Sequence, residues 1–318
     1  MTMATLEAEC PDLLGLERKV GTMPENAFAP RAGLKVWVGE GLVPAEQAVI
    51  NVFDHALLYG DGVFEGIRIY HGKIFKEQEH IQRFFESAKV IRLDLPISAE
   101  RLSRAMYDTI RANGVSGDGY IRLVVTRGVG ALGISIRRTA NPTIIIIVDK
   151  ISLYPVEVYE RGLHCIISSI TRNHVNALNP RIKSLNYLNN VLAKAEAHAA
   201  GADEAIMLGV DGHVCECTGD NIFVVRNGEL LTPGTWEGLL EGITRDVVME
   251  LARRRGIPVR ETSLVRHDLF VAQEVFASGT AAEIVPITDI SGIPVGDGKP
   301  GRITKQLTED FAAYRNAV

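Results

Sequence analysis

The 318-residue sequence contains few cysteines and no long hydrophobic run. Its four cysteines, at positions 10, 165, 215 and 217, are too few for a dense disulfide framework in a chain of this length. The longest strongly apolar run, residues 144–148, is far too short to cross a bilayer. The first residues also lack the basic flank and apolar run of a signal peptide. The sequence therefore predicts a cytoplasmic protein.

A strong charge of one sign is also missing. Asp and Glu number 39 against 34 Lys and Arg, which gives a formal net charge of -5 with no basic block. Such a chain is a poor candidate for binding nucleic acid or an anionic membrane. Hydrophobic residues make up 46% of it, so it can bury a sizeable core and still hold an internal cavity.

The cysteines give only a weak metal-binding pattern. Cys215 and Cys217 alternate with Glu216 on a probable strand, which places both thiols on one face and the carboxylate on the other. His213 lies close by, but no second ligand pair appears at the spacing of a zinc site. We expect no metal site and favour buried thiols. Taken alone, Glu216 is typical of a solvated surface carboxylate.

Residues 128–133, Gly-Val-Gly-Ala-Leu-Gly, match the dinucleotide pattern G-x-G-x-x-G. That binding mechanism requires a helix that opens at the glycines, so that its N-terminus meets the pyrophosphate. Here a proline and then a β-branched run follow the glycines, which predicts a loop that leads into a strand. The segment is therefore expected to be a flexible loop that could close over a cleft, rather than a nicotinamide site.

Periodicity and chain breakers divide the sequence into four parts. Residues 1–33 contain several prolines and predict a loosely attached N-terminal arm. Residues 34–148 predict a small α+β domain in the order strand, strand, helix, helix, strand, strand. Residues 149–160 predict a linker, and residues 161–318 predict a larger α+β domain. A cleft between two such domains is a usual place for a ligand.

Lys183 lies between a predicted strand and a predicted helix, with Ile182 and Leu185 as apolar neighbours. Loss of solvation there would disfavour the charged amine, and a lysine needs this to form imines near neutral pH. The alternative is an ordinary solvated surface lysine, and the position of Lys183 in the sequence, taken alone, favours that alternative. Lys183 therefore becomes a strong candidate only through the segments around it.

Two later segments could approach a phosphate group. Residues 241–246, Glu-Gly-Ile-Thr-Arg-Asp, open an amphipathic helix whose free backbone N–H groups would favour an anion. An ordinary N-cap by Thr244 is the alternative. Residues 278–283, Ser-Gly-Thr-Ala-Ala-Glu, follow a strand and would let a ligand approach the backbone closely, with a tight turn as the alternative.

Seven segments, taken together and in order, resemble the fold-type IV pyridoxal phosphate enzymes, and most of all the branched-chain amino acid aminotransferases. They are YGDGVFEGIRIY (59–70), EHIQRF (79–84), GYIRLVVTRG (119–128), IKSLNYLNNVLAK (182–194), ECTGDNIF (216–223), EGITRD (241–246) and SGTAAEI (278–284). The resemblance covers about residues 35–316. It implies an α+β, two-domain fold like that of D-amino acid aminotransferase, with the cofactor in the interdomain cleft.

The resemblance implies that the cofactor is pyridoxal 5'-phosphate and that Lys183 is the catalytic residue, which holds it as a Schiff base. Glu216 would pair with the pyridine nitrogen and keep it protonated, which makes the ring an electron sink. Tyr187 would lie near the ring hydroxyl.

The resemblance also assigns the phosphate of the cofactor to Arg83, helped by the Ile243 N–H, Thr244 and Thr280. An arginine fork together with a helix N-terminus suits a phosphate dianion.

The residues implied on the substrate side are Tyr59, Phe64, Tyr120, Arg122, Ile134, Tyr154 and Ala281. Tyr120 and the backbone N–H groups of Thr280 and Ala281 would hold the α-carboxylate. Arg122 would receive the distal carboxylate of glutamate or 2-oxoglutarate. The loop 128–135 would come from a partner subunit, with Ile134 closing the pocket, so the resemblance implies at least a homodimer.

The expected reaction is ping-pong transamination from L-valine, L-leucine or L-isoleucine to 2-oxoglutarate, with Lys183 as general acid and base. Alternatives within the fold are D-amino acid aminotransferase, (R)-amine transaminase and aminodeoxychorismate lyase, which share Lys183, Arg83 and Glu216. An alternative of another class is a pyridoxal phosphate carrier or regulatory protein without turnover. Tyr59, Tyr120 and Arg122 favour the branched-chain function, because one pocket must accept both apolar and acidic side chains.

Overall fold

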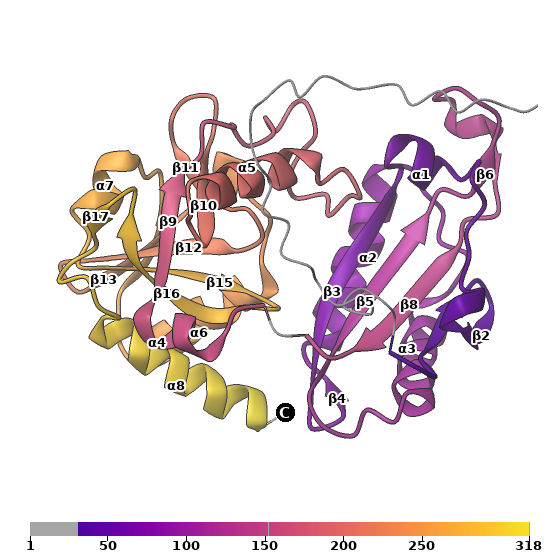
Figure 1. Cartoon of the computed structure of the whole chain (residues 1–318), viewed down its shortest axis with the longest axis horizontal. Coiled ribbons are helices and arrows are strands. Elements are labelled where there is room, and N and C mark those ends of the chain that lie inside the picture. Colours follow the sequence, from indigo (N-terminus) through magenta and orange to yellow (C-terminus); the bar gives the residue numbers. More distant parts are fainter. Residues whose placement is uncertain (1–30, 152, 318) are drawn as a thin grey trace, which may run out of the picture.

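The computed structural model describes residues 31–151 and 153–317, so the predicted N-terminal arm lies outside it except for residues 31–33. Two main β-sheets lie side by side, and helices pack on each of them (Figure 1). The strands of the first sheet end at Asp149 and those of the second begin at Leu163. Within the described ranges, no helix is long and apolar enough to cross a membrane.

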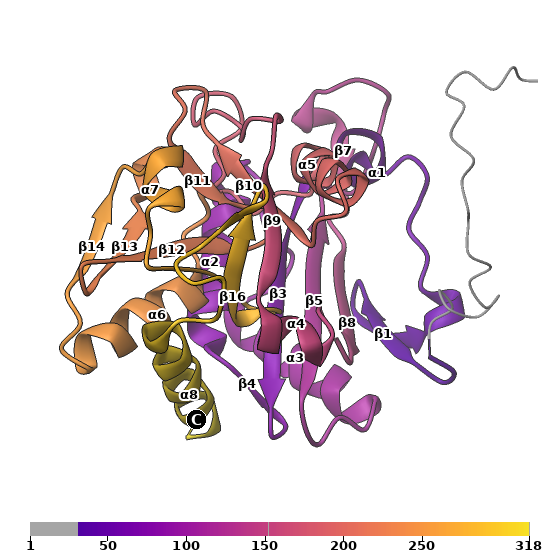
Figure 2. The same ribbon diagram turned by 60° about the vertical axis from the view of Figure 1, so that its left-hand side comes forward.

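The first sheet is antiparallel and has the strand order β2-β1-β8-β5-β3-β4. Its elements are β1 (Lys35–Val38), β2 (Gly41–Pro44), β3 (Gly62–Tyr70), β4 (Lys73–Ile74), β5 (Gly119–Thr126), β8 (Ile144–Asp149), α2 (Glu77–Val90) and α3 (Ala99–Ala112). Leu102, Met106 and Ile110 recur at helical spacing on α3 and are buried. They pack with Ile146 and Val148, which alternate along β8, so the helices cover one face of this sheet (Figure 2).

The second sheet has the strand order β11-β10-β9-β16-β15-β12-β13-β14, with β17 paired to β16. Its strands are β9 (Leu163–Ile167), β10 (Glu204–Leu208), β11 (Val214–Cys217), β12 (Asn221–Arg226), β13 (Glu229–Pro233), β14 (Val259–Thr262), β15 (Glu274–Gly279), β16 (Glu283–Ile290) and β17 (Ile293–Pro294). The pairs β9–β10, β9–β16 and β13–β14 are parallel, and the others are antiparallel.

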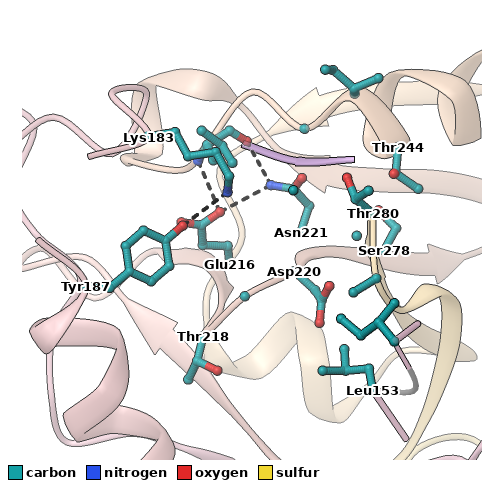
Figure 3. Close-up of a pocket in the computed structure, with 18 of the residues that line it drawn as sticks. Leu153, Lys183, Tyr187, Glu216, Thr218, Asp220, Asn221, Thr244, Ser278 and Thr280 are labelled. Carbon is teal, nitrogen blue, oxygen red and sulfur yellow. Dashed lines mark hydrogen bonds between the residues drawn. The ribbon is translucent and has the colours of Figure 1, made fainter. Parts of the chain in front are cut away.

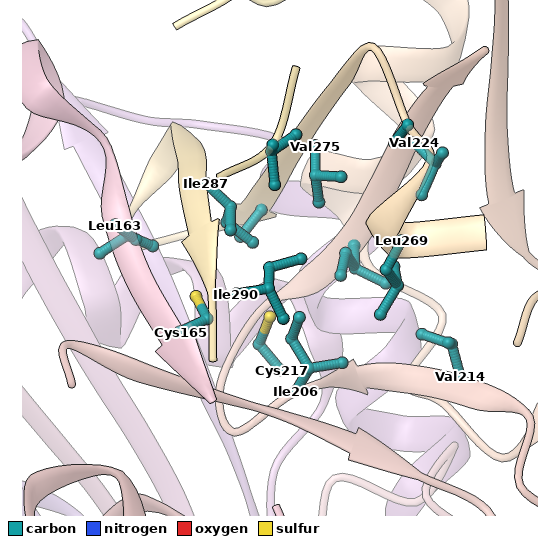
Figure 4. Packing of buried hydrophobic residues seen from close by; sticks show 14 of the residues in the cluster. Leu163, Cys165, Ile206, Val214, Cys217, Val224, Leu269, Val275, Ile287 and Ile290 are labelled. Carbon is teal, nitrogen blue, oxygen red and sulfur yellow. The ribbon is translucent and has the colours of Figure 1, made fainter. Parts of the chain in front are cut away.

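Alternating side chains give the second sheet a core on each face. Ile222 joins a cluster with Cys165, Cys217 and Ile287 (Figure 4), whereas the neighbouring Phe223 joins a separate cluster under helices α6 and α8. The remaining elements are α1 (His55–Tyr59), α4 (Val156–Arg161), α5 (Leu188–Ala199), α6 (Ile243–Arg254), α7 (Arg266–Phe270), α8 (Arg302–Asn316), β6 (Val129–Gly130), β7 (Thr139–Ala140) and the short 3-10 helices Ala45–Gln47, Ile136–Arg138 and Thr235–Glu237.

Two departures from the expected elements concern the second sheet and the segment that leads to it. The segment predicted as a linker contains helix α4, which begins directly after Pro155, a residue that fits the start of a helix. The sequence pattern also gave no sign of β16, the eight-residue strand between β9 and β15. Pro286 interrupts that strand, but its pairing with β9 begins only at Ile287, so the missing N–H of the proline is tolerated.

Candidate active site

A cavity of about 290 Å³ lies between the two sheets (Figure 3). The first sheet contributes side chains from β3 and β5, and the second contributes the β11–β12 segment, the β15–β16 turn and the start of α6. The cavity lining contains every predicted cofactor-binding residue, namely Arg83, Lys183, Tyr187, Glu216, Ile243, Thr244 and Thr280. It also contains the predicted substrate residues Phe64, Tyr120, Arg122, Tyr154 and Ala281.

Lys183 is held by backbone contacts with the first sheet. The Phe64 N–H donates to the Lys183 carbonyl oxygen at 2.9 Å, and the Lys183 N–H donates to Ser87 Oγ at 3.2 Å. The amine Nζ lies 4.7 Å from the centre of the Phe64 ring and donates to the Tyr187 hydroxyl at 3.3 Å. The lysine is therefore fixed on both sides while its amine reaches the cavity.

Arg83 is anchored by Glu65, a carboxylate to which the sequence pattern assigns no role. Its Nε and Nη2 donate to the two oxygens of Glu65, each at 2.7 Å, and its Nη1 donates to the Glu241 carbonyl oxygen at 2.6 Å. His80 Nδ1 lies 2.8 Å from the same carboxylate. Burial acts to raise the pKa of Glu65, but Arg83 and His80 outweigh it and lower that pKa to about 2. Arg83 is thus held as a cation beside the start of α6.

The start of α6 has free backbone donors. Its N-cap is Gly242, and no side chain caps the helix, so the alternative of an ordinary Thr244 N-cap does not apply. A Cβ at Gly242 would lie 1.9 Å from Asn221 Oδ1, so only glycine fits there. Thr244 is buried and lines the cavity. The helix end, Arg83 and Thr280 together form a site with the donors that a phosphate needs.

Glu216 faces the cavity, while the cysteines on either side of it are buried away from it. Arg172 Nε donates to Glu216 Oε1 at 2.8 Å, and the Leu240 N–H donates to Oε2 at 3.1 Å. Cys217 belongs to the core cluster, and the Cys215 thiol donates to the Glu237 carbonyl oxygen. The side chains of residues 215–217 therefore alternate between the two faces of β11 as predicted, and both thiols are buried. The pattern did not reveal Arg172, which lies 44 residues from its partner.

His213 does not join the cysteines in a ligand set. Its Nδ1 lies 3.1 Å from Asp211 Oδ2 and 3.0 Å from Glu237 Oε2, so the group of potential ligands around it consists of these two carboxylates and neither cysteine.

The substrate end of the cavity combines aromatic rings with a cation. The Arg122 guanidinium lies 4.6 Å from the centre of the Phe64 ring and 5.8 Å from that of Tyr120. A Cβ at Gly66 would lie 2.1 Å from the Tyr120 hydroxyl, so the absence of a side chain there leaves room for it. The Tyr154 hydroxyl donates to Glu204 at 3.1 Å. An apolar or an acidic side chain could contact this surface.

Two predicted substrate residues, Tyr59 and Ile134, lie outside the cavity of their own chain. Ile134 is 83% exposed in the loop between β6 and β7. The Tyr59 hydroxyl accepts a hydrogen bond from the Gly133 N–H at 2.8 Å, which ties α1 to this loop. The glycines of residues 128–133 lead into a 3-10 turn and β7 rather than a helix, as expected from the sequence.

The donor set fits pyridoxal phosphate. Lys183 offers an amine, the start of α6 with Arg83 offers an anion site, and the Glu216 carboxylate lies on the cavity wall between fixed donors. Ser278 Oγ is buried and has no hydrogen-bond partner among the described residues. A polar ligand in the cavity would satisfy these groups.

Comparisons with known proteins agree with this geometry. The model of the amino-transferase class IV family matches residues 62–290. A putative branched-chain-amino-acid aminotransferase of Methanocaldococcus jannaschii is 49% identical over 282 residues, covering 89% of this chain and 96% of that protein. The branched-chain-amino-acid aminotransferase of Escherichia coli K12 is 38% identical, covering 87% and 91%. The crystal structure of the branched-chain amino acid aminotransferase from Thermobaculum terrenum, in its PLP-form, superposes with a TM-score of 0.82 at 35% identity, covering 90% of this chain and 94% of that one.

Proposed function

The chain belongs to the class IV aminotransferase family, and on this basis we propose that it transfers the amino group of L-valine, L-leucine or L-isoleucine to 2-oxoglutarate. The products are branched 2-oxo acids and L-glutamate. The observation that carries this function is the cavity in which Lys183, Arg83 and Glu216 lie together with an aromatic and cationic substrate end.

Pyridoxal phosphate is the cofactor of this family, and we assign its contacts from the donor set. Arg83, Ile243, Thr244 and Thr280 would hold the phosphate, and Glu216 would accept a hydrogen bond from the ring nitrogen. When bound, the cofactor supplies a ring that accepts the electron pair released at the substrate Cα.

Lys183 would attach the cofactor and, once displaced by the substrate amine, move the proton at Cα as general acid and base. Tyr187, 3.3 Å from Nζ, would hold the amine in reach. Arg172 and the Leu240 N–H fix the Glu216 carboxylate from two sides, which keeps it in place through both halves of the reaction. The amino donor and the 2-oxo acceptor would bind in the same cavity, one after the other.

The substrate contacts follow the same reasoning. Tyr120 and the backbone N–H groups of Thr280 and Ala281 would bind the α-carboxylate. Arg122 would pair with the distal carboxylate of 2-oxoglutarate, while Phe64 and Tyr154 would contact the branched side chain. The Arg122 guanidinium can lie over an aromatic ring, so a cation and an apolar surface lie side by side. One pocket could therefore bind both the branched-chain amino acid and 2-oxoglutarate.

A homodimer is part of the proposal. Exposed apolar side chains gather in the segment around α1 and the β6–β7 loop, namely Val49, Val52, Phe53, Leu57, Leu132 and Ile134. A cluster of this kind favours burial against another subunit. Residues 128–135 would then reach the neighbouring cavity, with Tyr59 bound to the same loop. The exposed position of Ile134 supports this arrangement.

Two coarser proposals complete the description. We place the small domain at residues 34–148 and the large one at 161–318, joined by residues 149–160, because each main sheet lies almost wholly within one range. We also place the protein in the cytoplasm, which suits the free thiols of Cys165, Cys215 and Cys217.

The relatives do not favour the other activities of the fold, since those compared above are branched-chain amino acid aminotransferases. A panel of L- and D-amino acids with 2-oxoglutarate tests the choice. We expect glutamate formation with L-valine, L-leucine and L-isoleucine and little with their D-enantiomers. A clear preference for D-amino acids, or cofactor binding without any glutamate formed, would contradict the proposal.

Lys183→Ala is the matched inactive variant for this panel. It should lose both the absorbance of the lysine-linked cofactor and all transamination, because Lys194, the other lysine that lines the cavity, is paired with Glu204. Lys89→Ala, on the outside of α2, should keep both. Retention of activity in Lys183→Ala would overturn the assignment of the catalytic residue.

A further inference from the structure

Asp220 is a buried carboxylate in the cavity that none of the proposed roles uses. It lies between β11 and β12, is only 5% exposed and lines the cavity. Figure 3 shows its side chain pointing into the cavity, on the same side as Thr280 and Ser278. Neither carboxylate oxygen has a hydrogen-bond partner among the described residues. Because Asp220 lines the cavity, a ligand bound there can supply the partner that its carboxylate lacks.

The carboxylate lies against the turn that connects β15 to β16. A Cβ at Gly279 would lie 1.8 Å from Asp220 Oδ1, so the two are in direct contact. The next two residues, Thr280 and Ala281, line the cavity and are the proposed carboxylate-binding turn. A carboxylate bound at that turn would therefore lie close to Asp220.

The surroundings of Asp220 disfavour a negative charge. Burial, helped by the nearby Glu204, raises its pKa to about 7, although Lys194 and Lys183 act in the opposite direction. Glu204 accepts hydrogen bonds from Lys194 Nζ at 2.7 Å and from Tyr154 at 3.1 Å, so these two donors are already used. Asp220 is left without a cation of its own among the described residues.

We propose that Asp220 binds the α-carboxylate of the amino acid or 2-oxo acid in its neutral form, by donating its carboxyl O–H. This rests on the proposed function, because the ligand is a substrate of that reaction. An ionised Asp220 would instead repel the substrate carboxylate within the cavity. Asp220 is therefore a substrate-contacting residue that sets the pH range in which carboxylates bind.

The sign of the pH dependence follows from that pKa. Below about pH 7, Asp220 is protonated and donates; above it, the negative charge opposes the ligand. The titratable groups around it are Glu204, Glu216, Lys183, Lys194, Tyr154, Tyr159 and Cys217. Burial raises the pKa of Tyr154, Tyr159 and Cys217 above their ordinary values, so these three stay neutral across the range.

The test is the affinity of the holoenzyme for 4-methylvalerate, which has the carbon skeleton of leucine without its amine. Its carboxylate is ionised throughout the range, so only the protein titrates. We expect binding to weaken about tenfold or more between pH 6 and pH 8.5 in the unmodified protein. Asp220→Asn, which keeps a neutral donor of similar shape, should bind about equally at both pH values.

Three controls keep the outcome distinct from a folding defect or a wrong function. Asp220→Asn should keep the cofactor absorbance, which shows that it folds and binds the cofactor, whereas failure of the unmodified protein to transaminate at any pH would instead overturn the proposed function. The exposed variant Asp94→Asn should keep the full pH dependence. The uncharged amide of the same acid should bind with an affinity that does not depend on pH. Equal pH dependence in Asp220→Asn and the unmodified protein, or in acid and amide, would overturn the role of Asp220.

Discussion

At the scale of single residues, the phosphate end of the cavity depends on Glu65, a carboxylate with no exposed surface. It accepts two hydrogen bonds from Arg83 and faces His80. Burial lowers the pKa of His80 below its usual value, so the imidazole is neutral and donates Nδ1–H to the carboxylate. One buried anion thus fixes both the direction and the charge of Arg83.

Glu65→Gln should destabilise the protein by about 3 kcal/mol at neutral pH, because Arg83 would be left buried without its counter-charge. The folded-state pKa of about 2 lies below the ordinary value of 4.5, so this stabilisation is present above about pH 4.5 and is lost as the pH falls toward 2. Urea unfolding at pH 7 and pH 4 measures it. The exposed Glu100→Gln should change stability little, and equal stability of the two variants would contradict the role of Glu65.

Sequence motifs identified the residues that carry chemistry better than the residues that hold them. Lys183, Arg83 and Glu216 lie in recognisable segments, and all three line the cavity. Glu65 lies in a recognisable segment but has no role assigned from it, and Arg172 lies outside these segments; their partners are 18 and 44 residues away. Pairing at such separations is decided by the packing of strands and helices, which no local pattern contains.

At the scale of elements, glycines in the strands make room for the substrate end. Gly66 on β3 is buried, and its missing side chain leaves space for the Tyr120 hydroxyl of the neighbouring strand β5. The added Cβ would meet only the far end of a side chain, so the strand itself could persist while Tyr120 moves.

Gly66→Ala should raise the KM for the amino acid about tenfold with a smaller change in kcat, because it displaces Tyr120 from the substrate carboxylate. Steady-state kinetics with L-leucine measures the two constants separately. Gly41→Ala on β2, where a Cβ would meet nothing within 4 Å, is the matched control and should change neither. An unchanged KM in Gly66→Ala would count against the assignment of Tyr120.

Most helices and strands could be predicted from periodicity, and the exceptions have physical reasons. The sequence pattern does not predict β16 because Pro286 is unusual in a central strand, and only the short pairing with β9 makes it acceptable. The pattern predicts a linker in place of helix α4 because Pro155 is a chain breaker, although proline also fits the start of a helix.

At the scale of the whole molecule, one chain does not bring all predicted substrate residues into its own cavity. α1 holds the β6–β7 loop away from it, through the Tyr59–Gly133 hydrogen bond and a 3.0 Å contact between His55 Nε2 and the Ala131 carbonyl oxygen. The loop is thus preformed and carries the exposed Ile134 outward, which suits insertion into a second copy.

Ile134→Asp should reduce activity about tenfold or more if the loop completes the neighbouring cavity. Hybrid dimers with Lys183→Ala test this directly, because the cavity with the intact lysine would receive the intact loop of the other chain. We expect the mixture to be more active than either variant alone. As a control, the double variant Lys183→Ala/Ile134→Asp is mixed with Ile134→Asp, and this mixture should gain no activity. If the first mixture also gains no activity, Ile134 does not act across subunits.

The sequence by itself determined the class of chemistry, because seven segments in order resemble a known enzyme family, although the lysine, the helix start and the strand carboxylate each had an ordinary alternative when taken alone. It also determined most elements, since hydrophobic periodicity is a local property. Only the tertiary structure decided which buried partners hold these groups and that Asp220 faces the cavity without a partner among the described residues. It also decided that Tyr59 and Ile134 lie away from their own cavity. Such relations depend on how two sheets and their loops meet in space, over separations that the order of residues does not encode locally.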